Sequence, residues 1–162
     1  MDPYESKLKR FIDDNHIDAE LMPFNTLVDH KDNVLEAIKD MDIDFKDIVK
    51  TVVFIDQDKT IEEGNAVVAI VPGESRVNRV KLKELCNSRI KIAGSEEVLK
   101  LTGYPAGGVP PFGYDARFYI DKSLANKESA IYVGGGSVYS LTRTKISEII
   151  KFSRPIIEDI IE

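Results

Sequence analysis

The stretch from Leu101 to Tyr114, LTGYPAGGVPPFGY, contains four glycines and three prolines, and its residue types could support chemistry at the backbone. Glycine allows positive φ angles and lets a ligand approach bare backbone, whereas proline fixes φ and lacks an N–H group. Gly107 and Gly108 could therefore direct amide N–H groups at a developing oxyanion or at a phosphate. The alternative interpretation is an elaborate connection between two strands.

A single lysine, Lys50, interrupts the apolar segment DIVKTVVF. A lysine in such a segment is costly unless its ammonium group reaches water or an anion. Lys50 is therefore a candidate for positioning a negatively charged part of a substrate. The alternative is a lysine at the start of a strand, whose stem covers apolar surface while its ammonium group reaches solvent.

Two other segments could contact a ligand. Gly134 to Gly136 directly follow an expected strand, and they either line a binding site or form a bulge or tight turn. The segment RVNRVKLK contains no acidic residue, so it forms either a solvated face or a contact with the backbone of a nucleic acid. Its four basic residues are Arg76, Arg79, Lys81 and Lys83.

The rest of the chain offers little side-chain chemistry. No paired carboxylates and no Ser/His/Asp arrangement stand out, and the sequence contains no Walker loop or dinucleotide-binding fingerprint. His16 and His30 have no Cys or His partner at ligand spacing, so we expect no metal and no cofactor. The lone Cys86 is expected on the buried face of a helix rather than as a catalytic thiol. An enzyme built from these residues would rely on positioning, backbone donors and one cation.

Length and charge narrow the class of protein. A chain of 162 residues predicts one domain, over residues 1–162. Its net charge of -6 argues against non-specific coating of nucleic acid, although it allows a local basic patch. No apolar run approaches the ~20 residues of a membrane span, and no secretory signal is visible. A single cysteine fits a reducing compartment, so we expect a cytoplasmic protein without membrane contact.

The spacing of apolar residues predicts the elements that must hold these groups. Helices are expected over 4–15, 32–41 with Asp32 as N-cap, 81–86, 95–103 opened by Ser95, and 144–152. Strands are expected over 17–24, 47–56, 64–73, 89–94, 116–121, 130–136 and 137–143, with a further turn at Pro155. Regular βαβ alternation is missing. The pattern therefore predicts a mixed α/β domain of the α+β type, with a curled, barrel-like sheet surrounded by helices.

Five features in a fixed order resemble the YbaK/ProX family of aminoacyl-tRNA editing domains. They are IVKT at 48–51, LKEL at 82–85, TGYPAGGVPPFG at 102–113, a strand ending in Asp121, and IYVGGG at 131–136. The similarity extends from about Glu5 to Phe152, and its most specific part is the glycine–proline loop. The resemblance implies hydrolysis of the ester that joins a wrong amino acid to the 3′ end of a tRNA. Bacterial relatives clear alanine or cysteine from proline tRNA.

The resemblance also implies roles for individual residues. Lys50 matches the lysine of the family's KT motif, which positions the substrate, and Thr51 follows it. Gly107 and Gly108 match the paired glycines, whose amides would hold the substrate carbonyl or the terminal adenosine. The later glycines correspond to Gly135 and Gly136, which with the adjacent Ser137 would line the same pocket.

Several positions depart from the family pattern. Many relatives have serine where this chain has Pro110, and proline-tRNA editors often have threonine or serine before the second helix, where this chain has His30. The segment after Gly136 is shorter than in the cysteine-clearing type, and an aspartate expected there has no clear counterpart. We therefore expect a retuned amino-acid pocket that includes Pro110 and His30. His30 is interpreted as a pocket residue or general base, or as a solvent-facing side chain.

These features lead to three hypotheses. The first is a trans-editing aminoacyl-tRNA deacylase whose partners are aminoacyl-tRNA and a synthetase, with RVNRVKLK and Lys7, Lys9 and Arg10 meeting tRNA phosphates. The second is a non-catalytic module of the same fold that binds tRNA or a synthetase. The third, weaker one is hydrolysis of an unrelated small ester.

Overall fold

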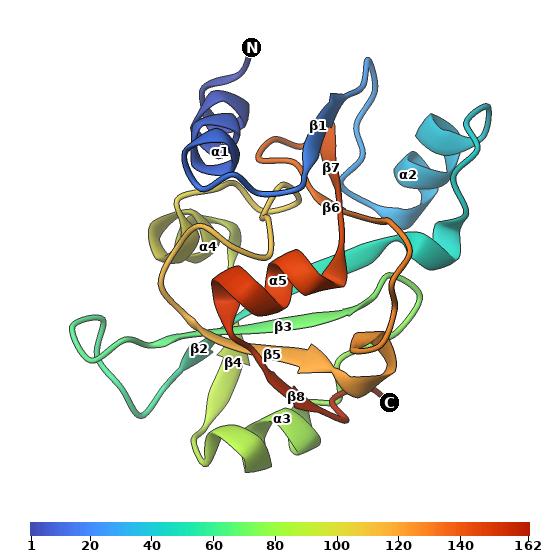
Figure 1. Cartoon of the computed structure of the whole chain (residues 1–162). Helices are drawn as coiled ribbons and strands as arrows, with labels where there is room; N and C mark the ends of the chain where they lie inside the picture. Colours follow the sequence, from blue (N-terminus) through green and yellow to red (C-terminus); the bar gives the residue numbers. More distant parts are fainter.

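The computed structural model describes all 162 residues and contains five α-helices and two β-sheets (Figure 1). The helices are α1 (Pro3–Asp14), α2 (Lys31–Ile38), α3 (Arg79–Cys86), α4 (Ser95–Thr102) and α5 (Ile146–Ser153), and the 3₁₀ turns are η1 (Phe45–Asp47) and η2 (Lys122–Leu124). The strands are β1 (Glu20–Pro23), β2 (Val49–Asp56), β3 (Ala66–Pro72), β4 (Ile90–Ile92), β5 (Arg117–Asp121), β6 (Ile131–Gly134), β7 (Ser140–Thr144) and β8 (Ile156–Glu158).

The strands form one mixed and one antiparallel sheet. The five-stranded sheet has the order β4-β2-β3-β5-β8, in which β5 runs parallel to both β3 and β8. The three-stranded sheet has the order β1-β7-β6 and is antiparallel throughout. In Figure 1 the smaller sheet stands above the larger one, with α2 at its side and α3 below. The predicted mixed α/β class is therefore confirmed.

The barrel-like closure of the sheet was a wrong prediction. The two sheets touch through a single bridge between Ile48 and Tyr132, and no ladder joins β2 to β6. On this side β2 pairs only with β4, over Phe54–Asp56. The segment of β2 between the bridge and β4 therefore has no strand partner on one edge. A Cβ on Gly134, at the end of β6, would lie 2.1 Å from the carbonyl oxygen of Val109, so the glycine–proline loop lies against β6 in the place of a continuing ladder.

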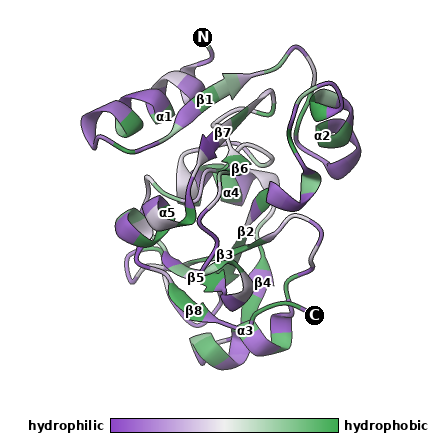
Figure 2. Cartoon of the chain, turned by 45° about the vertical axis from the view of Figure 1, so that its right-hand side comes forward, coloured by the Kyte–Doolittle hydropathy of each residue, from purple (hydrophilic) through white to green (hydrophobic).

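Strand β3 is buried on both faces. Val68 and Ile70 face the main core, which contains residues of α1, α4 and α5, while Val67, Ala69 and Val71 face Leu82 of α3. A strand covered on both faces needs a continuous apolar run rather than alternation, which explains the sequence AVVAIV. Figure 2 shows this contrast between the apolar central strands and the amphipathic colouring of α1 and α3.

The ends of three elements differ from the sequence expectation. Helix α2 begins at Lys31 with His30 as an N-cap that makes no side-chain hydrogen bond, so Asp32 lies in the first turn and does not cap the helix. The N-cap of α4 is Gly94, whose N–H donates to Oε1 of Glu97 at 2.9 Å. The isoleucine-rich segment after Pro155 forms β8, because the free edge of β5 offers it backbone partners. No helix has the length and apolar composition that a membrane crossing requires.

Candidate functional site

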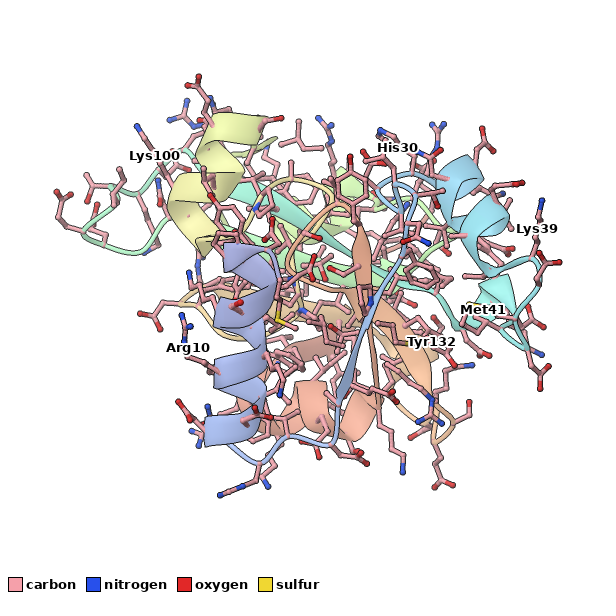
Figure 3. All side chains as sticks on the ribbon, turned by 90° about the horizontal axis from the view of Figure 1, so that it is seen from above. Arg10, His30, Lys39, Met41, Lys100 and Tyr132 are labelled. Atoms are coloured by element: carbon pink, nitrogen blue, oxygen red, sulfur yellow. The ribbon has the colours of Figure 1, made fainter.

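A cavity of about 270 Å³ lies where the two sheets separate. Its walls come from residues 48–52 of the β2 segment, from the end of β6, from the glycine–proline loop at Gly107 and Val109, and from the residues around the start of α2. The Ile48–Tyr132 bridge closes one end, and the unpaired edge of β2 forms one side. Figure 3 labels Tyr132 on β6 and His30 on the loop before α2. The cavity therefore exists because the sheet fails to close.

The apolar part of this cavity belongs to a small separate core. Helix α2 presents its buried face to the three-stranded sheet and to η1, which surrounds the cavity with aliphatic and aromatic side chains. The cavity-lining members of this core are Val28, Val34, Phe45, Ile48, Tyr132 and Leu141. Such a wall suits an uncharged side chain or an apolar ring face of a ligand.

Lys50 provides a cation in the cavity wall. Burial is the main cause that lowers the pKa of its ammonium group, and the positive charge of Arg76 lowers it further. Neither Lys50 nor Arg76 forms an ion pair with a carboxylate of the chain. Two neighbouring cations without a counter-charge favour an anionic ligand group such as a phosphate.

The glycine–proline loop contributes free backbone donors. Gly107 has a φ of +89°, and a Cβ at this position would lie 2.8 Å from Cβ of Asp29, so only glycine fits. The N–H groups of Gly107 and Val109, which both line the cavity, have no protein acceptor. The N–H of Gly108 instead donates to the carbonyl of Pro105 at 3.0 Å. The loop thus has unoccupied amides at Gly107 and Val109, two cavity-lining residues, whereas the amide of Gly108 is occupied.

Thr51 also lines the cavity, beside Lys50. Its hydroxyl oxygen is buried and has no hydrogen-bond partner in the protein. A buried hydroxyl without a partner costs free energy, about 1–3 kcal/mol in typical proteins, so such groups require an explanation. A polar group of a bound ligand would satisfy it.

Besides Gly108, four predicted substrate-binding residues lie outside the cavity lining. The position of Cβ on Gly135 would be 2.5 Å from the carbonyl carbon of Ser140, and that on Gly136 would be 2.8 Å from the carbonyl oxygen of Tyr4. Gly135 and Gly136 therefore permit close backbone packing. Of the three glycines, only Gly134 lines the cavity. The other two residues of the four are Pro110 and Ser137.

Pro110 and Ser137 both form hydrogen bonds with other residues of the protein. The carbonyl of Pro110 accepts a hydrogen bond of 2.7 Å from the hydroxyl of Tyr114. The hydroxyl of Ser137 donates to Oε2 of Glu5 at 2.6 Å, and its oxygen lies 2.9 Å from that of Ser140. Ser137 and Glu5 are both buried, so this network fastens α1 to the glycine segment.

The predicted basic segment does not form one continuous face. Arg76 acts on Lys50, as described above, but the guanidinium of Arg79 lies 5.9 Å from the ring centre of Phe54. The ammonium group of Lys81 donates to Asp159 and to the carbonyl of Ile161, both at 2.8 Å. Lys83 contributes to lowering the pKa of Asp58, for which hydrogen bonds from Arg89 are the main cause. Of the four, only Arg76 acts electrostatically on Lys50.

The N-terminal basic residues are placed elsewhere. The ammonium group of Lys7 donates to the carbonyl of Gly103 at 3.2 Å, and that of Lys9 pairs with Asp13 at 2.9 Å. Figure 3 shows Arg10 on α1, well separated from His30. None of the three lines the cavity.

Sequence reasoning proposed His30 for the pocket but missed its neighbours Asp29 and Lys31, which also line the cavity at the start of α2. Oδ1 of Asp29 accepts a hydrogen bond of 3.0 Å from Asn33, and the ammonium group of Lys31 lies 5.4 Å from the ring centre of Phe45. The side chain of His30 lines the rim and is 79% exposed, with Nε2 3.6 Å from Oδ2 of Asp29. A charged loop before a helix gives no signal in one sequence. Only the tertiary contact between Asp29 and Gly107 identifies this wall.

Residues 29–152 match the family model described as "Aminoacyl-tRNA editing domain", and the chain belongs to this family. The YbaK/ProX resemblance is thereby confirmed. The matched range includes Lys50, the glycine–proline loop and every cavity-lining residue except Val28.

Individual relatives agree with this assignment. The chain is 27% identical over 114 residues to a proline–tRNA ligase of Caldicellulosiruptor saccharolyticus, which covers 70% of this chain but only 19% of the ligase. It is 32% identical over 91 residues to the uncharacterized protein YwhH of Bacillus subtilis, covering 53% of this chain and 58% of YwhH. The chain therefore spans less than a fifth of the length of such ligases.

Two solved structures share the fold over nearly the whole chain. The hypothetical protein APE2540 superposes with a TM-score of 0.79 at 26% identity, over 96% of this chain and 99% of its own. A candidate trans-editing enzyme for prolyl tRNA synthetase superposes with a TM-score of 0.81 at 24% identity, over 100% of this chain and 99% of its own.

Proposed function

We propose that this protein is a trans-acting aminoacyl-tRNA deacylase, which hydrolyses the ester between a wrong amino acid and the 3′-terminal ribose of a tRNA. Membership in the editing-domain family supports the reaction class. The observation that carries the proposal is one cavity that combines Lys50, two amides without a protein acceptor at Gly107 and Val109, and an apolar wall.

Each wall would meet one part of the substrate. The cations Lys50 and Arg76 suit the phosphate next to the terminal adenosine, and the hydroxyl of Thr51 suits a ribose oxygen. The amides of Gly107 and Val109 would stabilise the oxyanion that forms when water attacks the ester carbonyl. The apolar wall would take the side chain of the amino acid. The attack releases the free amino acid and the 3′-terminal hydroxyl group of the tRNA.

The chain supplies little acid–base chemistry for this step. The one carboxylate in the cavity wall, Asp29, accepts a hydrogen bond from Asn33, and the one histidine there, His30, is mostly exposed. An aminoacyl ester is already activated, so a positioned water, assisted by a substrate group, and oxyanion stabilisation would suffice. The proposed catalyst therefore works mainly through orientation.

We propose a mischarged proline tRNA as the substrate, with alanine or cysteine as the first candidates. The proline–tRNA ligases among the relatives and the candidate trans-editing enzyme among the similar structures support this choice of tRNA. The mainly apolar wall supports a small side chain without charge. The proposed partners are the 3′ end of aminoacyl-tRNA and a prolyl-tRNA synthetase.

A deacylation screen tests the proposal. Alanyl-, cysteinyl- and seryl-tRNA of proline specificity, with correctly charged prolyl-tRNA as the control substrate, would be incubated with the wild-type protein and with Lys50→Ala. We expect loss of one mischarged ester, slowed about 100-fold by the substitution. Lys46→Ala is the matched control, because the Lys46 side chain is 72% exposed and does not line the cavity.

The screen also separates the two main hypotheses. If no ester is lost while tRNA still binds, the protein is a non-catalytic binding module of the editing fold. This second function is considered because the one histidine in the cavity is mostly exposed and no catalytic triad is present.

A further inference from the structure

Asp29 is a carboxylate in the cavity wall next to the free amides. Its side chain is only 21% exposed, and its Cβ lies 2.8 Å from the position that a Cβ on Gly107 would occupy. Asp29 and Gly107 are therefore in direct contact, although 78 positions separate them in the chain. Any group that the amide of Gly107 binds has Asp29 as its neighbour.

No cation of the protein satisfies this carboxylate. Oδ1 accepts a hydrogen bond from the neutral amide of Asn33 at 3.0 Å. The nearest ionisable partner of Oδ2 is Nε2 of His30 at 3.6 Å, which exceeds hydrogen-bonding distance. The ammonium group of Lys31 lies instead over the ring of Phe45, at 5.4 Å from its centre. A largely buried carboxylate without a full partner favours a cationic ligand group.

An aminoacyl ester carries a cationic group at the required place. Its α-ammonium group is two covalent bonds from the carbonyl carbon, so a carbonyl held at Gly107 brings the ammonium group to the neighbouring carboxylate. We propose that Asp29 binds the α-ammonium group of the substrate. This inference rests on the proposed function and narrows its substrate class to esters with a free α-amino group.

The charges of the cavity then fix the orientation of the substrate. Lys50 and Arg76 attract phosphate and repel an ammonium group, whereas Asp29 has the opposite preferences. An N-blocked ester, such as formylaminoacyl-tRNA or peptidyl-tRNA, presents a neutral amide to Asp29 and leaves its charge unpaired. The site therefore rejects the tRNAs that carry an initiating amino acid or a growing chain, and it accepts freshly charged ones.

Hydrolysis of free and N-acetylated alanyl-tRNA tests this selectivity. We expect wild-type protein to prefer the free ester by about 100-fold in kcat/KM, and Asp29→Asn to reduce that preference to about 3-fold by losing activity on the free ester only. Asparagine keeps an acceptor for Asn33. Asp32→Asn is the matched control, because Asp32 is exposed on the first turn of α2 and does not line the cavity. An unchanged preference in Asp29→Asn would overturn the inference.

A binding measurement separates this inference from the proposed function. The probes are 3′-alanylamido-adenosine, which cannot be hydrolysed as an ester, and its N-acetyl derivative. We expect wild-type protein to bind the free amine at least about 30-fold more tightly, and Asp29→Asn to bind both equally. Amine-dependent binding without any ester loss would remove the deacylase function and keep the ammonium site. Equal binding of both probes by wild-type protein would remove the ammonium site itself.

Discussion

The N–H of Gly136 donates a hydrogen bond of 2.8 Å to the carbonyl of Gly108. This bond joins the two glycine-rich segments, which the sequence separates by more than twenty residues. It lies just behind the cavity wall formed by Gly107, Val109 and Gly134. The two segments therefore hold each other in place, and the free amides of the loop depend on the fit between them.

The first prediction concerns this fit. In Gly134→Ala the new Cβ would meet the carbonyl oxygen of Val109 at 2.1 Å, and backbone cannot move aside cheaply. We expect a loss of about 3 kcal/mol in the free energy of unfolding, or roughly 6–12 °C in Tm. Gly94→Ala is the control, because its Cβ meets nothing closer than 3.5 Å. Similar Tm values for the two variants would show that the segments are not tightly packed.

The second prediction separates stability from activity at Lys50. Burial lowers the pKa of its ammonium group, so the folded state holds this proton less well than the unfolded state. The protonated form therefore destabilises the fold below the lowered pKa, and this cost disappears as the pH rises toward 10.5. Lys50→Met should thus have an equal or higher Tm at neutral pH, with a smaller difference near pH 10, yet deacylate about 100-fold more slowly. A markedly lower Tm at neutral pH would contradict this account.

The third prediction compares two basic residues of the same segment. The charge of Arg76 acts on Lys50 and has no carboxylate partner, whereas Lys81 is engaged by Asp159 and Ile161. Arg76→Ala should weaken tRNA binding and reduce the slope of log K against log salt concentration by about 1. Lys81→Ala should leave that slope unchanged and cost at most about 1 kcal/mol of stability. Fluorescence titrations with proline tRNA at several salt concentrations would show the difference, and equal slopes for both variants would refute it.

The fourth prediction concerns Ser137, which the sequence places in the substrate pocket but the structure places beside Glu5. Removing its hydroxyl leaves a buried carboxylate without a donor, so Ser137→Ala should lose about 1–3 kcal/mol of stability. Deacylation per folded molecule should stay within about 2-fold of wild type, because Ser137 does not line the cavity. Thermal unfolding and single-turnover assays measure the two effects. Lost activity at an unchanged Tm would contradict this prediction and indicate that Ser137 contacts the substrate.

Local patterns were sufficient to predict most of the elements. The apolar run of β3 and the helical spacing in α1 are visible in single segments, since each reflects burial of one or two faces. The sequence predicts a turn at Pro155 and not strand β8. This strand has only three residues, all with exposed side chains, so its strand conformation depends on the hydrogen bonds to β5 and leaves no apolar pattern in the sequence. The prediction of a barrel-like sheet was wrong for a similar reason. Whether two sheets join is decided by contacts between distant segments.

The site was only partly predictable for the same physical reason. Lys50 and Gly107 stood out because a buried charge and a positive φ violate ordinary local preferences. Asp29 violates nothing locally, since an aspartate before a helix is common. Its position in the wall follows from packing against Gly107, which no spacing in the sequence expresses. Likewise, the occupied amide of Gly108 became visible only with the turn that closes on Pro105.

The last residues of the chain bind to the backbone at Arg76 and Val77, and the charge of Arg76 acts on Lys50 in the cavity wall. Glu162 donates its N–H to the carbonyl of Arg76 at 3.1 Å, and Ile161 forms a bridge with Val77. Lys81 fastens the same segment from the side. Residues 159–162 thus hold the backbone at Arg76 and Val77, although none of them lines the cavity. A protein bound to residues 159–162 could therefore shift the backbone of Arg76, and with it the charge that acts on Lys50, without entering the cavity.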